Sequence, residues 1–421
     1  MFATGSAIDD SAPLTDLTAR SRMDAAVRRV KAAAAHGDGR GIVICGGGAK
    51  YFTCAWVCIN MLRRLGCALP VELWHLGADE MPPALRSLVE PLGVRCVDGA
   101  AMRVTRPARI LNGWELKPYA IIHSAFREVL ALDADNVPVI DPTYLFDAPE
   151  YAGCGAVFWP DYGRLARSRA AWSLTGVEYR DEPEFESGQI VVDKSRCAEP
   201  LSLTMWMNEH SDFWYRHVHG DKETFHLAWR KLDRPYAMPP YPIHTLGGTM
   251  CQHDFQGRRV FQHRNLRKWS LGSNPRTPGF DHEQECLAIV EQLRPYERAL
   301  RGFPTFDPAL SAPLAGRVVD YHRVGYDRRP ISLEADGSIG SGGDRMERLW
   351  GVRVHHGVPA LEIYGDDGIT ARLHRDRDDP SRWSGGWLVH ERMALEVRVG
   401  EQPSKGDVDS GAPVQLKPLA G

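Results

Sequence analysis

The sequence predicts an α/β fold, a mixed or parallel sheet with helices on both faces, followed by a small all-β unit. Strand, turn and helix patterns repeat through the first half of the chain, which indicates parallel strands with right-handed crossovers. An apolar run at residues 129–132, bounded by polar residues, is typical of a buried central strand. After residue 331 the pattern changes to short alternating segments, and Asp-Gly at 367–368 indicates a hairpin.

Length and composition fit a soluble globular protein of two domains. The chain has 421 residues, of which 43% are hydrophobic and 25% charged. We expect an α/β domain over 1–275, a linker with one helix over 276–315, an antiparallel sandwich or barrel over 316–400 and a disordered tail over 401–421. The net charge of −3 gives no reason to expect nucleic acid or an anionic membrane as partner.

Cysteine usage and the N-terminal residues predict a cytoplasmic location. The nine cysteines form no Cys-x-x-Cys pair and their number is odd, which favours reduced thiols. The start of the chain lacks a basic region followed by an apolar core, so it does not resemble a signal peptide. No stretch has the roughly 18 apolar residues of a membrane span.

The first elements in the chain predict a site for a phosphate. Residues 1–14 look disordered, 16–36 predict an outer helix and 41–45 a strand. Three glycines follow, 46–48, before a helix that reaches about residue 65, and such a turn lets backbone N–H groups approach an anion. Gly47 and Tyr51 are therefore candidate donor-binding residues, although the dinucleotide and Walker patterns are both absent. A tight structural turn is the alternative.

The next elements lead to the most informative motif. Residues 71–76 and 94–97 predict strands around a helix at 82–91, and 112–126 predict a helix that carries Lys117. The strand at 129–132 ends on Asp133 and Asp135, whose side chains point the same way if the strand continues. Two convergent carboxylates suit Mg²⁺ or Mn²⁺, with Lys117 placed to reach a diphosphate. Solvated turn residues are the alternative.

Further candidates follow this motif. Residues 154–158 and 184–194 predict strands, and Ser187 and Gly188 in the second indicate close backbone approach to a ligand or a neighbouring strand. Glu186 lies beside them. Helices are predicted over 201–215 and from residue 220. A short strand at 260–263 ends on His263, which could complete a Mn²⁺ site or be structural.

The first half of the chain resembles the mannosyltransferase family that includes the fungal α-mannosyltransferases. The matching pieces occur in one order: Leu62-Arg63 with Gly66 and 69–73; Lys117 with 118–120; 128–135; 186–189 with Asp193-Lys194; 220–225; and Phe261, His263, Asn265, Leu266 and Lys268. The resemblance implies a GT-A fold, a nucleotide-sugar donor (GDP- or UDP-hexose, mannose favoured), a divalent metal and retention of configuration. It also implies that Asp133, Asp135 and His263 hold the metal and that Lys268 faces the diphosphate.

Three functions remain open from the sequence. A metal-dependent glycosyltransferase would use Glu186 or Asp221 to stabilise a cationic sugar or orient an unknown acceptor, and Ser187 and Gly188 to bind the donor. A sugar-phosphate nucleotidyltransferase shares the strand, glycine turn and paired acids, but usually has an arginine soon after the glycines. A non-catalytic carbohydrate-binding protein would use Trp383 and Trp387 of the β unit; the alternative is that these rings form its core.

Overall fold

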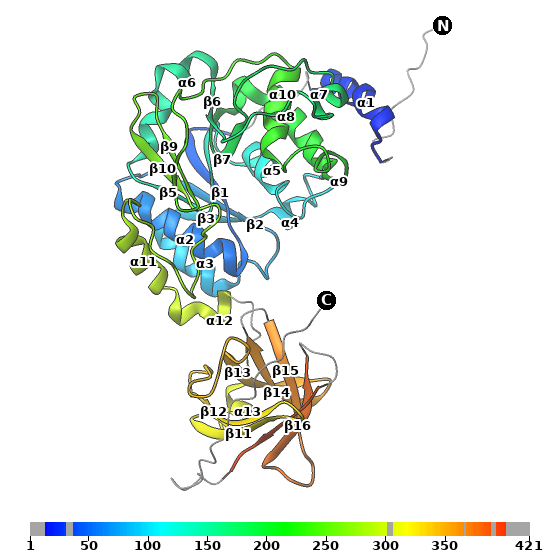
Figure 1. Cartoon of the computed structure of the whole chain (residues 1–421), viewed down its shortest axis with the longest axis vertical. Helices are drawn as coiled ribbons and strands as arrows, with labels where there is room; N and C mark the ends of the chain where they lie inside the picture. Colours follow the sequence, from blue (N-terminus) through cyan, green and yellow to red (C-terminus); the bar gives the residue numbers. More distant parts are fainter. Residues whose placement is uncertain (1–12, 31–36, 301–305, 366–367, 389–392, 401–421) are drawn as a thin grey trace, which may run out of the picture. The chain divides into compact units, whose positions relative to one another are not determined.

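The computed structural model describes residues 13–30, 37–300, 306–365, 368–388 and 393–400 (Figure 1). Contacts divide the chain into two compact units, Met1–Gly302 and Phe303–Gly421. The expected disordered tail at 401–421 and residues 1–12 lie outside the described residues. The expected fold class is confirmed, because the first unit is an α/β domain with a mixed sheet between two layers of helices and the second is all-β.

The first unit is built on a six-stranded sheet in the order β3-β2-β1-β4-β7-β6. Its strands are β1 (Arg40–Cys45), β2 (Val71–His75), β3 (Val94–Asp98), β4 (Glu128–Asp133), β6 (Ala156–Pro160) and β7 (Phe185–Asp193). β1 to β4 are parallel, whereas β7 runs antiparallel to both β4 and β6. The parallel strands therefore end at one edge, where ligands of open α/β sheets bind.

Alternating strand residues face two separate cores. Val43 and Val129 pack into one core, whereas Ile42, Ile44 and Leu130 pack into the other. One face is covered by α5 (Leu116–His123), α8 (Lys194–Glu209) and α10 (Lys222–Lys231), and α1 (Asp16–Val30) packs on α8 (Figure 1). The other face is covered by α2 (Gly48–Arg64) and α3 (Pro83–Val89), and α11 (Glu283–Glu291) packs on α2. The expected helix at 112–126 is shorter in the structure, because Asn112 to Glu115 form a loop before α5.

Shorter elements connect these layers. They are α4 (Gly99–Met102), α6 (Pro149–Cys154), α7 (Ala171–Thr175), α9 (Ser211–Trp214) and α12 (Glu297–Leu300), with 3₁₀ helices η1 (Glu90–Leu92), η2 (Pro142–Asp147) and η3 (Arg294–Tyr296). The segment that the sequence marks as a linker contributes α11 to the first unit, where Cys286 and Ile289 are buried. This helix packs on α2 and so belongs to the helical layer on that face of the sheet.

A second, antiparallel sheet lies beyond the end of β4. It contains β5 (Asn136–Pro138), β10 (Arg259–His263), β9 (Thr249–His253) and β8 (His244–Leu246), paired in that order. β5 begins immediately after Asp135, and Asn136 pairs with His263. This register carries His263, more than 120 residues away in sequence, to the turn that holds the two aspartates.

The second unit is a curved antiparallel sheet of seven strands. They are β11 (Arg317–Arg323), β12 (Asp327–Leu333), β13 (Leu349–His355), β14 (Val358–Gly365), β15 (Gly368–Arg375), β16 (Arg382–Trp387) and β17 (Met393–Arg398), after a short helix α13 (Pro308–Ser311). Residues 338 and 339 bridge the edge strands β12 and β13, so the sheet nearly closes. Trp383 and Trp387 are 4% and 5% exposed and pack in its core, which leaves them unavailable as a glycan platform.

Candidate functional site

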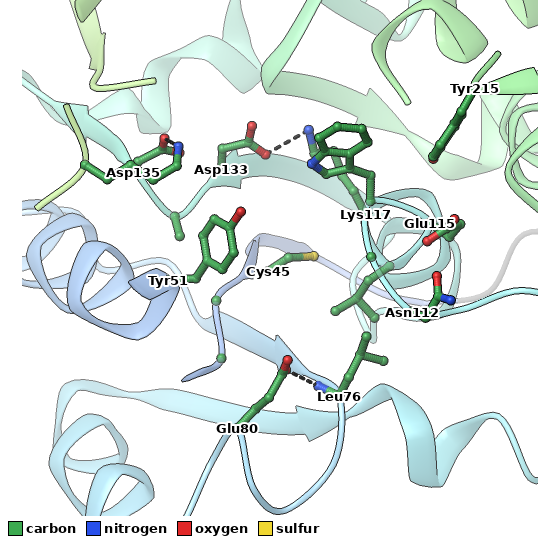
Figure 2. Close-up of a pocket in the computed structure, with 17 residues that line it drawn as sticks. Cys45, Tyr51, Leu76, Glu80, Asn112, Glu115, Lys117, Asp133, Asp135 and Tyr215 are labelled. Carbon is green, nitrogen blue, oxygen red and sulfur yellow. Dashed lines mark hydrogen bonds and ion pairs between the residues drawn. The ribbon is translucent and has the colours of Figure 1, made fainter. Parts of the chain in front are cut away.

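A cavity of about 390 Å³ opens at the carboxyl ends of β1 and β4 (Figure 2). These strands are neighbours, and Cys45 at the end of one pairs with Asp133 at the end of the other. The cavity is lined by residues 45–47, 112–117 and 133–135, and by Tyr51, Leu76, Glu80, Tyr215 and Lys268. It therefore occupies the place where an open α/β sheet binds its ligand.

Asp133 and Asp135 both line this cavity, as the sequence suggested. Asp133 is the last residue of β4, and its side chain is 28% exposed. Asp135 follows the strand in a turn, and its side chain is only 4% exposed. Ala134, between them, is buried in the core and anchors the turn. The two carboxylates are thus held at one wall, but in different surroundings.

Lys117 is buried among acidic and hydroxyl groups. Its Nζ lies 2.8 Å from Oδ1 of Asp133 and 3.0 Å from Oδ2 of Asp221, and it donates to Oγ and the carbonyl oxygen of Ser187 at 2.9 and 3.0 Å. Burial favours the neutral amine, but the two carboxylates outweigh it and raise the pKa of Lys117 above its ordinary value. Lys117 is therefore a fixed cation.

Lys268 and His263 hold Asp135 from two sides. Nζ of Lys268 donates to Oδ2 of Asp135, and Nε2 of His263 lies 3.2 Å from its Oδ1. Although burial opposes ionisation, His263 and Lys268 hold the pKa of Asp135 well below its usual range. Burial likewise opposes protonation of His263, but Asp135 and Glu186 raise its pKa to about 10.

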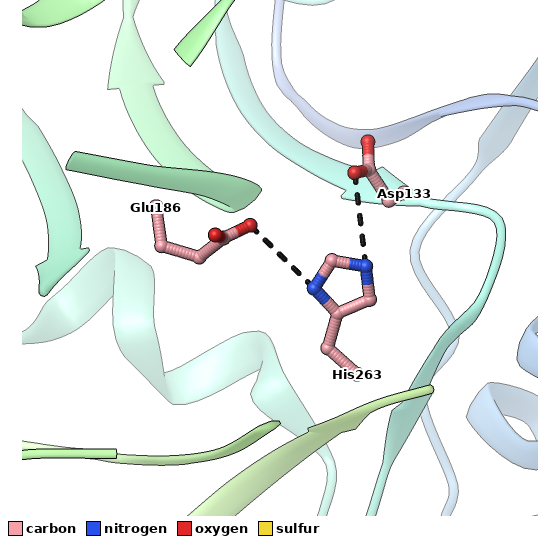
Figure 3. A group of neighbouring side chains, drawn as sticks. All are labelled: Asp133, Glu186 and His263. Carbon is pink, nitrogen blue, oxygen red and sulfur yellow. Dashed lines mark ion pairs between the residues drawn. The ribbon is translucent and has the colours of Figure 1, made fainter. Parts of the chain in front are cut away.

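Three side chains could share one metal ion. Asp133, Glu186 and His263 each offer a ligand atom, and these atoms lie within 4.8 Å of one another (Figure 3). His263 lies between the two carboxylates, with Nε2 3.9 Å from Oδ2 of Asp133 and Nδ1 3.5 Å from Oε1 of Glu186. Two carboxylates and an imidazole suit Mn²⁺, and Asp135 adjoins the group through His263.

Gly188 lets this group assemble. A Cβ at Gly188 would come within 2.6 Å of Nδ1 of His263 and 2.8 Å of Oε1 of Glu186. The backbone N–H of Gly188 instead donates to Oε1 of Glu186 at 2.7 Å. The close backbone approach that the sequence indicated thus serves His263 and Glu186, and Ser187 contacts Lys117 and Asp221.

The glycine turn forms the opposite wall of the cavity. Gly47 precedes α2, and a Cβ there would lie 2.6 Å from Oε2 of Glu80. Tyr51, in the first turn of α2, is 42% exposed, and Nζ of Lys268 lies 5.9 Å from its ring centroid. The structure therefore brings Gly47, Tyr51, Lys117, Asp133, Asp135 and Lys268 to one cavity, with Glu186, Ser187, Gly188, Asp221 and His263 behind its acidic wall.

Sequence reasoning missed the far side of the cavity. Asn112, Trp114, Glu115 and Tyr215 line it, together with Glu80 near the glycine turn. The sequence predicts a helix over the first three and a second helix, 201–215, that ends on Tyr215. Gly113 was the available signal, because glycine disfavours a helix interior and is typical of loops.

The arrangement defines the class of protein: an α/β domain with an acidic, lysine-flanked cavity at its strand ends. Residues 39–182 and 176–264 match the family described as "Mannosyltransferase putative". The matched span is more than half of the chain, which therefore belongs to this family. The resemblance noted in the sequence is confirmed.

Individual relatives are fungal enzymes. The chain is 26% identical over 275 residues to Alpha-1,2-mannosyltransferase MNN2 of Saccharomyces cerevisiae, covering 53% of this chain and 45% of the relative. It is 29% identical over 239 residues to Alpha-1,2-mannosyltransferase MNN24 of Candida albicans, covering 47% and 34%. The chain thus spans less than half the length of these relatives.

Solved structures also resemble parts of the chain. Mouse xyloside xylosyltransferase 1 has a TM-score of 0.35 at 14% identity and covers 47% of this chain and 84% of its own. The glycosyltransferase GlyE of Streptococcus pneumoniae has a TM-score of 0.38 at 13% identity and covers 64% and 66%. Among the described residues, no helix is long and apolar enough to cross a membrane.

Proposed function

We propose that this chain is a metal-dependent glycosyltransferase that moves a hexose, with mannose favoured, from a GDP- or UDP-sugar to a glycan or small-molecule acceptor. One observation carries the proposal: the cavity joins a glycine turn before a helix to an acidic strand end flanked by two lysines. The glycine turn and the lysines suit the negative charge of a nucleoside diphosphate, and the acidic strand end suits its divalent counter-ion. The family membership and the relatives' names support mannose as the sugar.

The metal-ligating side chains support a Mn²⁺ or Mg²⁺ ion held by Asp133 and His263, with Asp135 or Glu186 as a further ligand. Four ionisable groups meet here in a buried site, and a divalent cation would offset the carboxylate charge more fully than an imidazolium does. When bound, such an ion supplies Lewis-acid stabilisation of the charge on the departing diphosphate. The residues present fit this role.

The two lysines would stabilise the diphosphate as it leaves. Lys117 is held by Asp133 and Asp221, so its ammonium group is fixed before substrate binds. Lys268 is paired with Asp135 and is 24% exposed, which leaves it free to exchange this carboxylate for a phosphate oxygen. The two ammonium groups would then lie where negative charge develops.

The proposed transfer keeps the configuration of the anomeric carbon. The bond from that carbon to the phosphate oxygen breaks, and its electron pair leaves with the nucleoside diphosphate. The acceptor oxygen bonds on the same face, and its proton passes to the departing phosphate oxygen. Asp221, 6% exposed and beside Lys117, would stabilise the cationic sugar or orient the acceptor, and Glu186 would act beside it. The α linkage in the relatives' names agrees with retention from an α-linked donor.

The test is turnover of GDP-mannose, UDP-glucose and UDP-galactose with and without Mn²⁺, measured as release of nucleoside diphosphate. We expect one donor to be turned over, and Asp135→Ala to abolish most of that activity and change its metal dependence. Asp147→Asn is the matched control, because Asp147 is an exposed acid that pairs with Arg40 away from the cavity. Full activity of Asp135→Ala with unchanged metal dependence would contradict the assignment.

The proposal includes a cytoplasmic location. All nine cysteines are free thiols in the structure, which fits a reducing compartment. Titration of the denatured, unreduced protein with a thiol reagent should count nine thiols. A lower count in freshly purified protein would argue for an oxidising compartment.

A further inference from the structure

We propose that Trp114, Glu115, Asn112 and Tyr215 form a pyranose-binding subsite at the far side of the cavity, which we call the aromatic subsite. The inference rests on the proposed function and names the part of the cavity that takes a sugar ring. Figure 2 shows Asn112, Glu115 and Tyr215 on one side of the cavity, with Tyr51 and Asp135 on the other. The nucleotide-binding elements therefore leave this side open.

Glu115 carries an unused acceptor. The residue is only 3% exposed, yet its Oε2 has no hydrogen-bond partner among the described residues. Burying a carboxylate oxygen without a hydrogen-bond donor costs free energy, so such an oxygen indicates a site at which a ligand supplies the donor. Glu115 lines the cavity, and sugar hydroxyl groups are the donors that such an oxygen lacks.

Trp114 supplies an apolar surface beside this carboxylate. It is 57% exposed, which is unusual for so large a ring, and it lines the same cavity. The ring is nevertheless fixed in place: it lies 5.8 Å from the Tyr215 ring and packs on Gly220, where a Cβ would come within 2.9 Å. A ring held in this way can stack on the C–H face of a sugar at little entropic cost.

Tyr215 is held rigidly as well. Its hydroxyl donates to Oδ1 of Asn208 at 2.5 Å, and Nδ2 of Asn208 donates to Thr224 and to the carbonyl oxygen of Thr204, both at 2.8 Å. These buried bonds tie the aromatic subsite to α8 and α10. Two anchored rings and one carboxylate oxygen without a partner make a preformed site with convergent polar groups.

The aromatic subsite adjoins the reacting groups. The backbone N–H of Lys117 donates to the carbonyl oxygen of Trp114 at 3.1 Å. Gly220, which packs against the Trp114 ring, immediately precedes Asp221. A sugar ring on Trp114 would therefore lie beside the Lys117–Asp133–Asp221 cluster. Either the acceptor or the hexose of the donor could supply this ring, because both present hydroxyl groups and a C–H face.

The test separates these two sources by direct binding. Saturation-transfer NMR measures the affinity of the protein for methyl α-mannoside with GDP or UDP and Mg²⁺ present. Calorimetry measures its affinity for GDP, UDP, GDP-mannose and UDP-glucose. Glu115→Gln should weaken sugar binding about 10- to 100-fold, the range of one hydrogen bond to a charged group. Trp114→Ala should also weaken it, because the ring on which the sugar stacks is lost. Trp114→Phe should restore part of it, whereas the affinity for GDP and UDP should not change.

Matched controls are Tyr162→Ala and Glu90→Gln. Tyr162 is 58% exposed and Glu90 is also exposed, and neither lines the cavity. Binding of a deoxy-mannoside that lacks the hydroxyl facing Glu115 should fall in wild type and be insensitive to Glu115→Gln.

The outcomes are distinct. If the two variants bind methyl mannoside more weakly than wild type does, the subsite belongs to the acceptor. If they bind nucleotide sugars more weakly but GDP and UDP equally well, it belongs to the donor hexose. Unchanged affinity for every sugar in both variants overturns the inference. If no nucleotide binds but methyl mannoside binding still depends on Trp114, the aromatic subsite stands and the proposed transferase function fails.

Discussion

The ammonium group of Lys117 lies 2.8 Å from Oδ1 of Asp133, and both side chains are largely buried. Lys117 also contacts Asp221 and Ser187, so one cation joins β4, β7 and the start of α10. A side chain that links three elements in this way contributes to the fold as well as to the site.

We therefore expect Lys117→Met to lose activity and to destabilise the first unit by about 3–5 kcal/mol, because the buried Asp221 and the partly buried Asp133 would lose their counter-charge. Urea unfolding measures the free energy. Lys268→Met should cost clearly less stability, since Lys268 is 24% exposed and contacts one carboxylate. Equal stability of Lys117→Met and wild type would refute this account of Lys117.

Gly188→Ala tests the position of His263. The added methyl group would meet Nδ1 of His263 and Oε1 of Glu186, which must then move. A displacement on the order of 1 Å can lower the rate of turnover about 100-fold. Gly153→Ala is the control, because a Cβ there meets no atom within 4 Å. Similar turnover by the two variants would show that the close approach at Gly188 is unimportant.

His226 should make stability depend on pH. It is fully buried and its ring stacks on Phe185, with ring centroids 4.5 Å apart, and burial lowers its pKa to about 4. Between pH 6.5 and 4 the unfolded chain binds a proton that the folded chain does not. The free energy of unfolding should therefore fall as the pH is lowered through this window, by at most about 3 kcal/mol.

The measurement compares wild type with His226→Phe, because other groups also titrate in this range. The difference in unfolding free energy between the two proteins should change between pH 6.5 and 4. A constant difference across the window would mean that His226 does not titrate as its burial implies.

Trp383 tests the role of the β unit. Because the ring is 4% exposed in the core, Trp383→Ala should cost about 3–5 kcal/mol of the stability of that unit. Tyr326→Ala, at a ring that is 67% exposed, should cost much less. Thermal unfolding followed by circular dichroism measures the stability of each variant. If Trp383→Ala kept full stability but lost glycan binding, the carbohydrate-binding alternative would regain support.

The parallel part of the fold could be predicted from sequence because its signals are local. The apolar run before Asp133 marks a buried strand, the glycines mark the turn before α2, and Asp-Gly marks the hairpin of β14 and β15. The second sheet could not be predicted, because pairing of β5 with β10 joins segments more than 120 residues apart. The strand ending on His263 was visible, but its partner was not.

The candidate site divides in the same way. Asp133 and Asp135 stand out because two acids follow an apolar strand, and both line one cavity. Their different partners, Lys117 for one and Lys268 for the other, depend on contacts across the fold. Gly113 indicated a loop around Glu115, but the unpaired oxygen of Glu115 could not be predicted, because it is visible only once its surroundings are known.

The most direct test of the central claim is a thermal-shift screen with GDP- and UDP-sugars, each with and without Mn²⁺. The account predicts a metal-dependent rise in stability with the sugars of one nucleotide, about 2.7 kcal/mol at a hundredfold excess over Kd. Asp133→Asn should remove this rise. No shift with any nucleotide sugar, under conditions in which a nucleoside triphosphate stabilises the protein, would contradict the account and favour a nucleotidyltransferase.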